Sequence, residues 1–243
     1  MESNLSRLQD NNRIIIALDF DNQLAADQLI NQLDPQECRL KIGKEMFTYF
    51  GPQWVSSLVA RGFDIFLDLK FHDIPNTVHK ACTAAAKLGV WMINVHASGG
   101  FEMMQQARAA IQAHSGKKPL LTAVTVLTSM DQSQFSAIVD NLSIQEQVKR
   151  LALLAQEAQL DGVVCSAQEA VLLRQCVEPE FLLVSPGIRP IGSASGDQKR
   201  IVTPDQALKN GVDYLVIGRP ITASDDPVEA LKSINASIRK LIA

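Results

Sequence analysis

The feature that most constrains the fold of this 243-residue chain is the alternation of short apolar runs with longer segments of helical character. The apolar runs, rich in Ile, Leu and Val, lie at residues 14–18, 39–42, 64–69, 91–96, 120–127, 162–165, 181–184 and 214–217. Runs with little polar alternation are typical of parallel strands, because helices cover both faces of a parallel sheet. The alternation therefore predicts an α/β protein with eight parallel strands.

The segments between the apolar runs carry helical signals, most clearly at residues 76–88, 101–114 and 144–159. The last of these repeats apolar residues at helical spacing, at Val148, Leu151, Ala152, Ala155 and Ala158. Eight strands that alternate with helices favour a (β/α)8 TIM barrel. An open doubly wound sheet is the alternative, and the absence of a GxGxxG sequence after the first run weakens it.

The length fits a single barrel domain, since barrels of this kind commonly have about 250 residues. No linker rich in Pro, Gly or Ser divides the chain, so we expect one catalytic domain over residues 1–243, with residues 1–12 as an N-terminal extension. Residues 185–200, SPGIRPIGSASGDQKR, follow the seventh run. Long loops inside compact domains are often functional, and we expect this one to be an active-site lid.

Composition and charge exclude several classes of function. The net charge is −3, and no basic stripe predicts binding to nucleic acid or to a membrane surface. The polar N-terminus lacks the pattern of a signal peptide, and no apolar run has the length of a membrane span. Cys38, Cys82, Cys165 and Cys176 have neither CxxC nor zinc-type spacing, so we expect reduced thiols in a cytoplasmic protein.

Polar residues gather where the predicted strands end. They are, in chain order, Asp19, Lys41, Asp68, Lys70, Asn94, His96 and Thr128, the last at the end of the fifth strand. The carboxyl ends of barrel strands open on one face, where active sites lie, so we expect one shared site rather than unrelated solvated strand ends. We interpret His72 and His96 as structural residues, and Trp54 and Trp91 as core or interface residues.

The segment DLKFHD, which begins at Asp68, carries the most specific chemical signal. Asp68 and Lys70 are two residues apart on a predicted strand, so we expect both side chains on one face, with Asp73 following in the loop. A lysine flanked by carboxylates keeps its charge, which favours a proton donor and carbanion partner over a Schiff-base nucleophile. A structural salt-bridge network is the alternative, but Lys41 and Asp19 on neighbouring strands extend the cluster and favour catalysis.

A second group of residues is suited to bind phosphate. Gly218 and Arg219 directly follow the eighth run, where barrels often bind phosphate. Glycine lets backbone N–H groups approach an anion, the start of a following helix adds its dipole, and arginine presents a planar pair of donors. Arg189 and Gln198, in the predicted lid, are candidates to close over the same anion.

These motifs resemble those of the orotidine 5′-phosphate decarboxylase family, in its bacterial branch. The run DLKFHDIPNT has the family pattern DxKxxDxxNT, and IIIALD, LKIGKE, VHASGG, VTVLTSM, SPGIRP with GDQKR, and VIGRPIT occur in the family's order. The resemblance implies a carboxy-lyase that converts orotidine 5′-monophosphate into uridine 5′-monophosphate in de novo pyrimidine biosynthesis. It also implies a cytoplasmic homodimer that needs no cofactor and no metal.

The resemblance further implies roles for individual catalytic residues. Lys70 would protonate C6 of the pyrimidine as carbon dioxide leaves, and Asp68 would lie near the substrate carboxylate. Asp73, with Thr77, would reach into the active site of the neighbouring subunit, so that the two sites of the dimer are shared. Lys41 would complete the charged network.

The same resemblance implies how the substrate is bound. Lys41 and Asp19 would hold the ribose hydroxyls, and Thr128 would contact the pyrimidine ring. The phosphate would be bound, and the lid shaped, by Arg189, Gln198, Gly218 and Arg219.

Two other functions compete with this interpretation. Magnesium-dependent sugar-phosphate decarboxylases and hexulose-phosphate synthases are similar barrels that share Asp-x-Lys-x-x-Asp, but their second strand offers a glutamate as metal ligand. This chain has Lys41 there, which would repel a divalent cation, and Glu45 falls after the strand. A non-catalytic barrel that binds a phosphorylated ligand would keep Gly218 and Arg219 but would not need the charged cluster.

Overall fold

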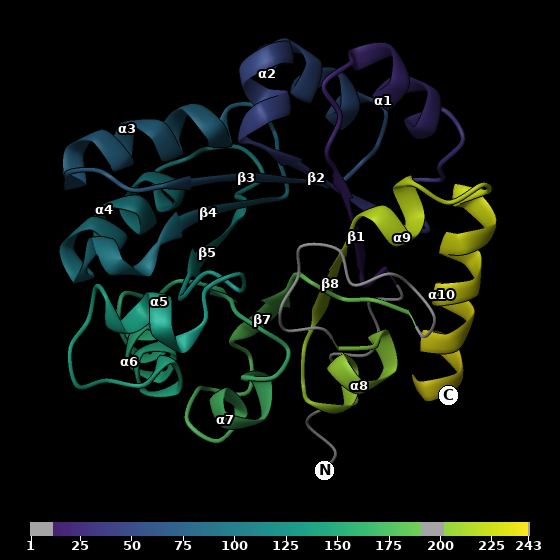
Figure 1. Cartoon of the computed structure of the whole chain (residues 1–243). Coiled ribbons are helices and arrows are strands. Elements are labelled where there is room, and N and C mark those ends of the chain that lie inside the picture. Colours follow the sequence, from purple (N-terminus) through teal and green to yellow (C-terminus); the bar gives the residue numbers. More distant parts are fainter. Residues whose placement is uncertain (1–11, 191–201, 243) are drawn as a thin grey trace.

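The computed structural model describes residues 12–190 and 202–242, which form a closed barrel of eight parallel strands (Figure 1). The strands are β1 Ile14–Leu18, β2 Arg39–Gly43, β3 Ile65–Phe71, β4 Met92–His96, β5 Leu120–Val124, β6 Gly162–Val164, β7 Leu182–Ser185 and β8 Tyr214–Ile217. They pair in chain order, and β8 pairs with β1 to close the barrel. The predicted single-domain (β/α)8 TIM barrel is confirmed.

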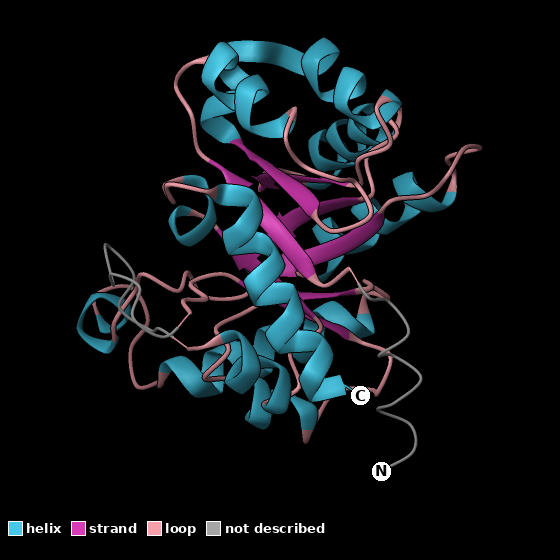
Figure 2. Ribbon diagram, turned by 90° about the vertical axis from the view of Figure 1, so that its right-hand side faces the viewer, coloured by secondary structure: helices cyan, strands magenta, loops and turns pink. Residues whose placement is uncertain are grey.

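Helices surround the barrel, so that the magenta strands of Figure 2 lie inside a layer of cyan helices. The helices are α1 Gln23–Ile30, α2 Lys44–Ala60, α3 Pro75–Ala86, α4 Phe101–Gln112, α5 Gln132–Ser136, α6 Ile144–Glu157, α7 Ala170–Arg174, α8 Pro204–Lys209, α9 Arg219–Thr222 and α10 Pro227–Ile242, with a 3-10 turn at Ala97–Gly99. Local sequence sets their starts. At α6, for example, Ser143 and Glu146 form a reciprocal capping box that satisfies two orphan N–H groups.

The apolar side chains of the strands belong to two separate cores, one on each face of the sheet. In β1, Ile14, Ile16 and Leu18 pack against the helices, whereas Ile15 and Ala17 face the barrel interior. Successive side chains of a strand point to opposite faces, and both faces are buried here. This explains why the strands read as uninterrupted apolar runs in the sequence.

The interior is closed at the amino ends of the strands by a stacked cation. The guanidinium of Arg39 lies 4.3 Å from the ring centroid of Trp91 and 5.1 Å from that of Tyr214. Its Nε is 3.4 Å from a carboxylate oxygen of Asp64. Arg39 and Trp91 are buried, so side chains fill this end of the barrel interior.

The predicted end of the fifth strand needs correction, and two other predicted segments lie mostly outside the described residues. The fifth strand, predicted at 120–127, ends at Val124, and the N–H and hydroxyl of the next residue, Thr125, both donate to the carbonyl of Val164. Thr128 therefore lies in a turn beyond the strand and not at its end. All of the predicted N-terminal extension except its last residue, and residues 191–200 of the predicted lid, lie outside the described ranges.

Gly162 marks a close approach of two strands and gives a test of the barrel geometry. A Cβ at this position would lie 2.6 Å from Leu182 Cβ and 2.8 Å from the Leu182 carbonyl carbon, on the paired strand β7. We expect Gly162→Ala to lower the free energy of unfolding by about 3 kcal/mol, because overpacking against backbone forces the strands apart.

Urea denaturation measures this change, with Gly116→Ala as the matched control. There the nearest atom is the imidazole of His114, a side chain that can rotate away, so we expect a change below about 0.5 kcal/mol. Equal stabilities of the two variants would contradict the described packing of β6 against β7.

Candidate active site

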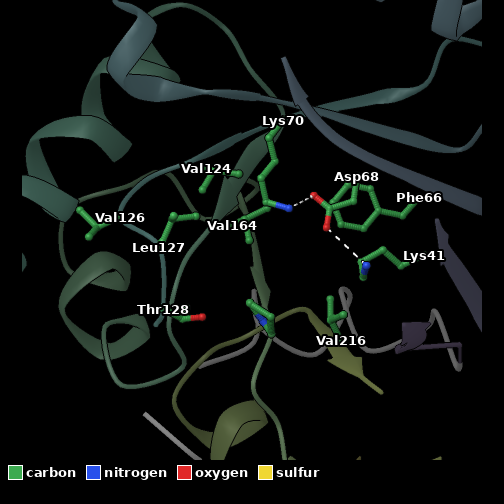
Figure 3. A pocket seen from close by; sticks show the side chains of 11 residues that line it. Lys41, Phe66, Asp68, Lys70, Val124, Val126, Leu127, Thr128, Val164 and Val216 are labelled. Atoms are coloured by element: carbon green, nitrogen blue, oxygen red, sulfur yellow. Dashed lines mark hydrogen bonds and ion pairs between the residues drawn. The ribbon is translucent and has the colours of Figure 1, made fainter. Parts of the chain in front are cut away.

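Charged side chains at the ends of three adjacent strands meet at the carboxyl end of the barrel, and Figure 3 shows those of Lys41, Asp68 and Lys70. Lys70 Nζ lies 2.6 Å from Asp68 Oδ1, and Lys41 Nζ lies 3.6 Å from Asp68 Oδ2. Lys41 Nζ is also 3.6 Å from Asp19 Oδ1. The structure thus brings together the four residues that the sequence placed at neighbouring strand ends.

The carboxylate of Asp68 is the centre of this cluster and is only 8% exposed. Burial by itself would raise the pKa of Asp68, but the charges of Lys41 and Lys70 and hydrogen bonds from Lys70 and Asn94 outweigh it and lower that pKa. Asp68 is therefore ionised at neutral pH, although it lies in the barrel interior.

The contact between Lys70 and Asp68 does not come from the regular alternation of side chains along a strand. Its φ is +52°, in the left-handed region, which is uncommon for a residue with a Cβ. The pairing of β3 with β4 also shifts register between Leu67 and Phe71. The two side chains do meet, as predicted, but the reason given for it was wrong, because Lys70 lies in an irregular part of the strand.

Asn94 is the site residue to which the sequence assigned no role. It is fully buried in β4, its Oδ1 accepts a hydrogen bond of 2.8 Å from the Lys70 N–H, and its Nδ2 donates one of 2.7 Å to Asp68 Oδ1. The position of Asn94 at a strand end was the only signal in the sequence. Its contacts depend on the irregular register and could not be predicted from it.

Asp73 and Thr77 do not join the cluster. Both are exposed, and the Asp73 carboxylate accepts a hydrogen bond of 2.7 Å from the N–H of Ile74. Within the described ranges, no ion pair links Asp73 to Lys70. Of the two flanking carboxylates in DLKFHD, Lys70 pairs in this chain with Asp68 alone.

Two adjoining pockets, whose linings share Lys41, Pro186 and Val216, form a cleft that extends from the charged cluster across the mouth of the barrel. At one end it is apolar, with Phe66, Val124, Val164 and Val216 from the barrel interior beside the cluster and Thr128 at its edge (Figure 3). Although Thr128 lies beyond β5, it does line the cleft as predicted. Such a mixture of apolar walls and few charged groups suits a planar, charged ring.

The opposite end of the cleft is basic. Arg189, Gly218 and Arg219 line it together with Asp19 and Lys41. Burial and the charge of Arg219 lower the pKa of Arg189, which means that the two guanidinium groups repel each other. An anion between them would relieve this repulsion. Helix α9, which begins at Arg219, is a single turn, so the predicted contribution of a helix dipole is small.

Not every predicted phosphate ligand can be placed. Gln198 lies outside the described residues. Arg189 itself is buried, and its backbone N–H donates to the carbonyl of Val202, two residues beyond the predicted lid. Arg189 therefore has a fixed position at the base of this loop.

His96 ends β4 next to the cluster, and its ring centroid is 5.5 Å from that of His72. Burial lowers the pKa of His96 to about 4, with further contributions from His72, Lys70 and Lys44. The imidazole is therefore neutral at neutral pH and does not carry the additional proton of an imidazolium acid. The interpretation of His96 as a packing residue agrees with this environment.

Other candidate features were searched for in the same ranges. Three or more His, Cys, Asp or Glu side chains placed to bind a metal ion do not occur among residues 12–190 and 202–242. Cys38, Cys82 and Cys165 are buried and Cys176 is partly buried, all as free thiols. Among the helices described, none is both long and apolar enough to cross a membrane.

Comparisons with known proteins agree on one family. The family model described as orotidine 5′-phosphate decarboxylase / HUMPS family matches residues 12–234. The orotidine 5′-phosphate decarboxylase of Pseudoalteromonas translucida (strain TAC 125) is 62% identical over 226 residues, which cover 93% of this chain and 97% of that protein. The protein of that name from Escherichia coli O81 (strain ED1a) is 58% identical over 238 residues, 98% of this chain and 97% of that one.

A solved structure gives the same result. The crystal structure of orotidine 5′-phosphate decarboxylase from Lactobacillus acidophilus superposes with a TM-score of 0.84 at 36% sequence identity. The superposition covers 93% of this chain and 99% of that one. The likeness thus extends over the whole barrel and includes the strands that carry the charged cluster.

The environment of His96 gives a test of the site's electrostatics. Its folded pKa of about 4 lies below the ordinary value of 6.5, so the unfolded chain binds more protons between these values. The stability that comes from a neutral His96 is present above this window and is lost as the pH falls through it. Urea denaturation measures the free energy of unfolding at each pH. When the pH is lowered from neutral to about 4, we expect this free energy to fall less in His96→Asn than in the wild type. Identical pH dependence of the two proteins would contradict the described burial.

Proposed function

The chain belongs to the orotidine 5′-phosphate decarboxylase / HUMPS family and converts orotidine 5′-monophosphate into uridine 5′-monophosphate in pyrimidine biosynthesis, and we propose that Lys70 and Asp68 perform the chemical step. The observation that carries the proposal is the 2.6 Å contact between Lys70 Nζ and Asp68 Oδ1, next to the apolar end of the cleft. A non-catalytic binding protein would have no use for such a buried charged pair.

The proposed chemistry follows from where the electrons go. When the C6–carboxylate bond breaks, the electron pair remains on C6 in the plane of the ring, where the π system cannot delocalise it. In our proposal the ammonium of Lys70 stabilises this pair and then donates its proton to C6. Water returns a proton to Nζ, so the enzyme is unchanged, and neither a cofactor nor a metal takes part.

Asp68 serves mainly to hold Lys70 in this proposal. A substrate carboxylate about 4 Å from Asp68 would be destabilised by roughly 4 kcal/mol at an effective dielectric constant near 20. Enzymes typically lower barriers by about 8–23 kcal/mol, so repulsion alone is insufficient. The attraction between Lys70 and the forming carbanion therefore supplies the larger part.

In this proposal different parts of the cleft bind different parts of the substrate. Arg189, Gly218 and Arg219 bind the phosphate, with Gln198 from the lid. Asp19 and Lys41, the members of the cluster that also line the basic end of the cleft, bind the ribose. Binding energy gathered at the phosphate, far from C6, positions the ring and closes the lid.

Thr128 completes the pyrimidine site in our proposal. It lines the apolar end of the cleft opposite the charged cluster. A hydroxyl at that place can form a hydrogen bond with the polar edge of a pyrimidine while the valines contact its faces.

We also propose that the enzyme is a homodimer with shared active sites. Asp73 and Thr77 follow the catalytic strand but are exposed, and the hydrogen bond described for the Asp73 carboxylate comes from the N–H of Ile74. Their placement suits a contribution to the site of a partner subunit. A cytoplasmic location is in keeping with the four free cysteines, which a reducing compartment preserves.

The proposed metal-independent decarboxylation is tested by a turnover assay. Purified protein, treated with a chelator, is mixed with orotidine 5′-monophosphate, and the loss of orotate absorbance is followed. We expect full conversion to uridine 5′-monophosphate without added metal. Turnover that requires magnesium, or that occurs only with a keto- or hexulose-phosphate, would contradict the proposal.

The role of Lys70 predicts a separation of turnover from binding. Lys70→Ala should lower turnover at least about a thousandfold, because both the proton donor and the cation are lost. Binding of uridine 5′-monophosphate, measured by calorimetry, should persist because the phosphate site is intact. Lys149→Ala, which removes an exposed lysine from α6, is the control and should keep full activity.

Shared sites predict complementation between two inactive variants. In a hybrid dimer of Lys70→Ala with Asp73→Ala, one site carries both substitutions and the other carries neither. Equal amounts mixed under exchange conditions should recover about a quarter of wild-type activity, since half of the dimers are hybrids with one intact site each. No recovery, with hybrids verified by mass spectrometry, would show that each site is built within one chain.

A further inference from the structure

We propose that Asn94 is a positioning residue for the decarboxylation: its carboxamide fixes the backbone of Lys70 and the carboxylate of Asp68 at the same time. The inference rests on the function proposed above, in which Lys70 is the proton donor. It adds a residue that never touches C6 but determines where the donor lies.

The need for such a residue comes from the irregular strand β3. On the side of β4, the ladder pairs Leu67 with Ile93 and next pairs Phe71 with Val95. Four residue steps on β3 therefore correspond to two on β4, and residues 68–70 leave the regular ladder. Bulges of this kind re-aim side chains and are common next to active sites.

Asn94 lies opposite the middle of this irregular stretch and replaces the missing ladder contacts. Its side-chain Oδ1 accepts the N–H of Lys70 at 2.8 Å, a bond that a backbone carbonyl would provide in a regular sheet. Its own backbone remains in register with Thr122 of β5, which anchors the residue. The side chain is completely buried, so water does not compete for these bonds.

The bond to the Lys70 N–H stabilises a conformation that lysine does not favour. At φ +52° the Cβ of an L residue is crowded by its own backbone. Asparagine and aspartate can support this conformation with their own short side chains, whereas lysine cannot. Without the bond, relaxation to negative φ would turn the Lys70 side chain away from the cleft.

The second end of the carboxamide closes a ring of contacts. Asp68 Oδ1 accepts both Asn94 Nδ2 at 2.7 Å and Lys70 Nζ at 2.6 Å. Lys70 is thus tied at its backbone through Asn94 and at its ammonium through Asp68, and Asn94 connects the two. Only a side chain with an acceptor and a donor on one short stem can make both bonds, which is the chemistry of a carboxamide.

The test measures the single-turnover rate of decarboxylation in Asn94→Ala. We expect the rate to fall about 100-fold, the size of effect that a misplaced catalytic group produces, while the Kd of uridine 5′-monophosphate changes less than about threefold. Thr122→Val is the matched control. It removes a buried hydroxyl from the adjacent strand whose bond, to the Ile93 carbonyl, does not involve Lys70. The backbone pairing of residue 122 with Asn94 is kept, so the rate should be unchanged.

Asn94→Asp gives a second measurement in a side chain of equal size. Its carboxyl accepts from the Lys70 N–H in either protonation state, but only its protonated form donates to Asp68. The rate of this variant relative to wild type should therefore fall as the pH rises. Taking the ratio removes the contributions of the neighbouring groups that both enzymes share, which are Asp19, His72 and His96. The charges of Lys41, Lys70 and Asp68 influence the pH at which the rate ratio changes, but they do not alter the direction of the change.

Three outcomes would overturn the inference. Asn94→Ala could turn over at the wild-type rate, or it could lose ligand binding and turnover in equal proportion. If Asn94→Ala does not fold, a pH-independent rate ratio in Asn94→Asp decides against it. The proposed function fails separately, if Lys70→Ala remains active.

Discussion

The buried carboxylate of Asp68 stays ionised because two lysines flank it, and the rest of the active site is arranged around that requirement. An ionised group in the barrel interior without partners would be strongly destabilising. Lys41 from β2, Lys70 from the irregular end of β3 and Asn94 from β4 supply the compensating charge and hydrogen bonds. The same contacts that keep Asp68 charged also aim Lys70 into the cleft.

The two ends of the barrel have different roles: the amino ends of the strands are packed, and the carboxyl ends carry the active site. At the amino ends of the strands, Arg39 stacked on Trp91 and Tyr214 closes the interior. At the carboxyl ends, the strands and the segments that follow them present a charged cluster, an apolar wall and a pair of arginines. Rigid strands hold these groups in place, so that binding energy at the phosphate can be used to position the reacting carbon.

The barrel and the charged cluster could be predicted from the sequence, because the physical constraints behind both predictions also hold in the folded chain. Apolar runs reveal strands buried on both faces, and strand ends in a barrel converge, so Asp19, Lys41 and Asp68 could be grouped without coordinates. The backbone of Lys70 and the contacts of Asn94 could not, because they depend on a register shift between β3 and β4 that leaves no local pattern. The fifth strand was predicted too long because apolar residues continue past its end.

Isotope exchange tests, without involving carbon dioxide, whether the Lys70 ammonium stabilises and protonates an electron pair on C6. By microscopic reversibility, the enzyme should also remove the C6 proton of bound uridine 5′-monophosphate. In D₂O, NMR should show deuterium entering C6 with the wild-type enzyme, and no exchange with Lys70→Ala although it still binds the nucleotide. Exchange at the wild-type rate in Lys70→Ala would contradict the account.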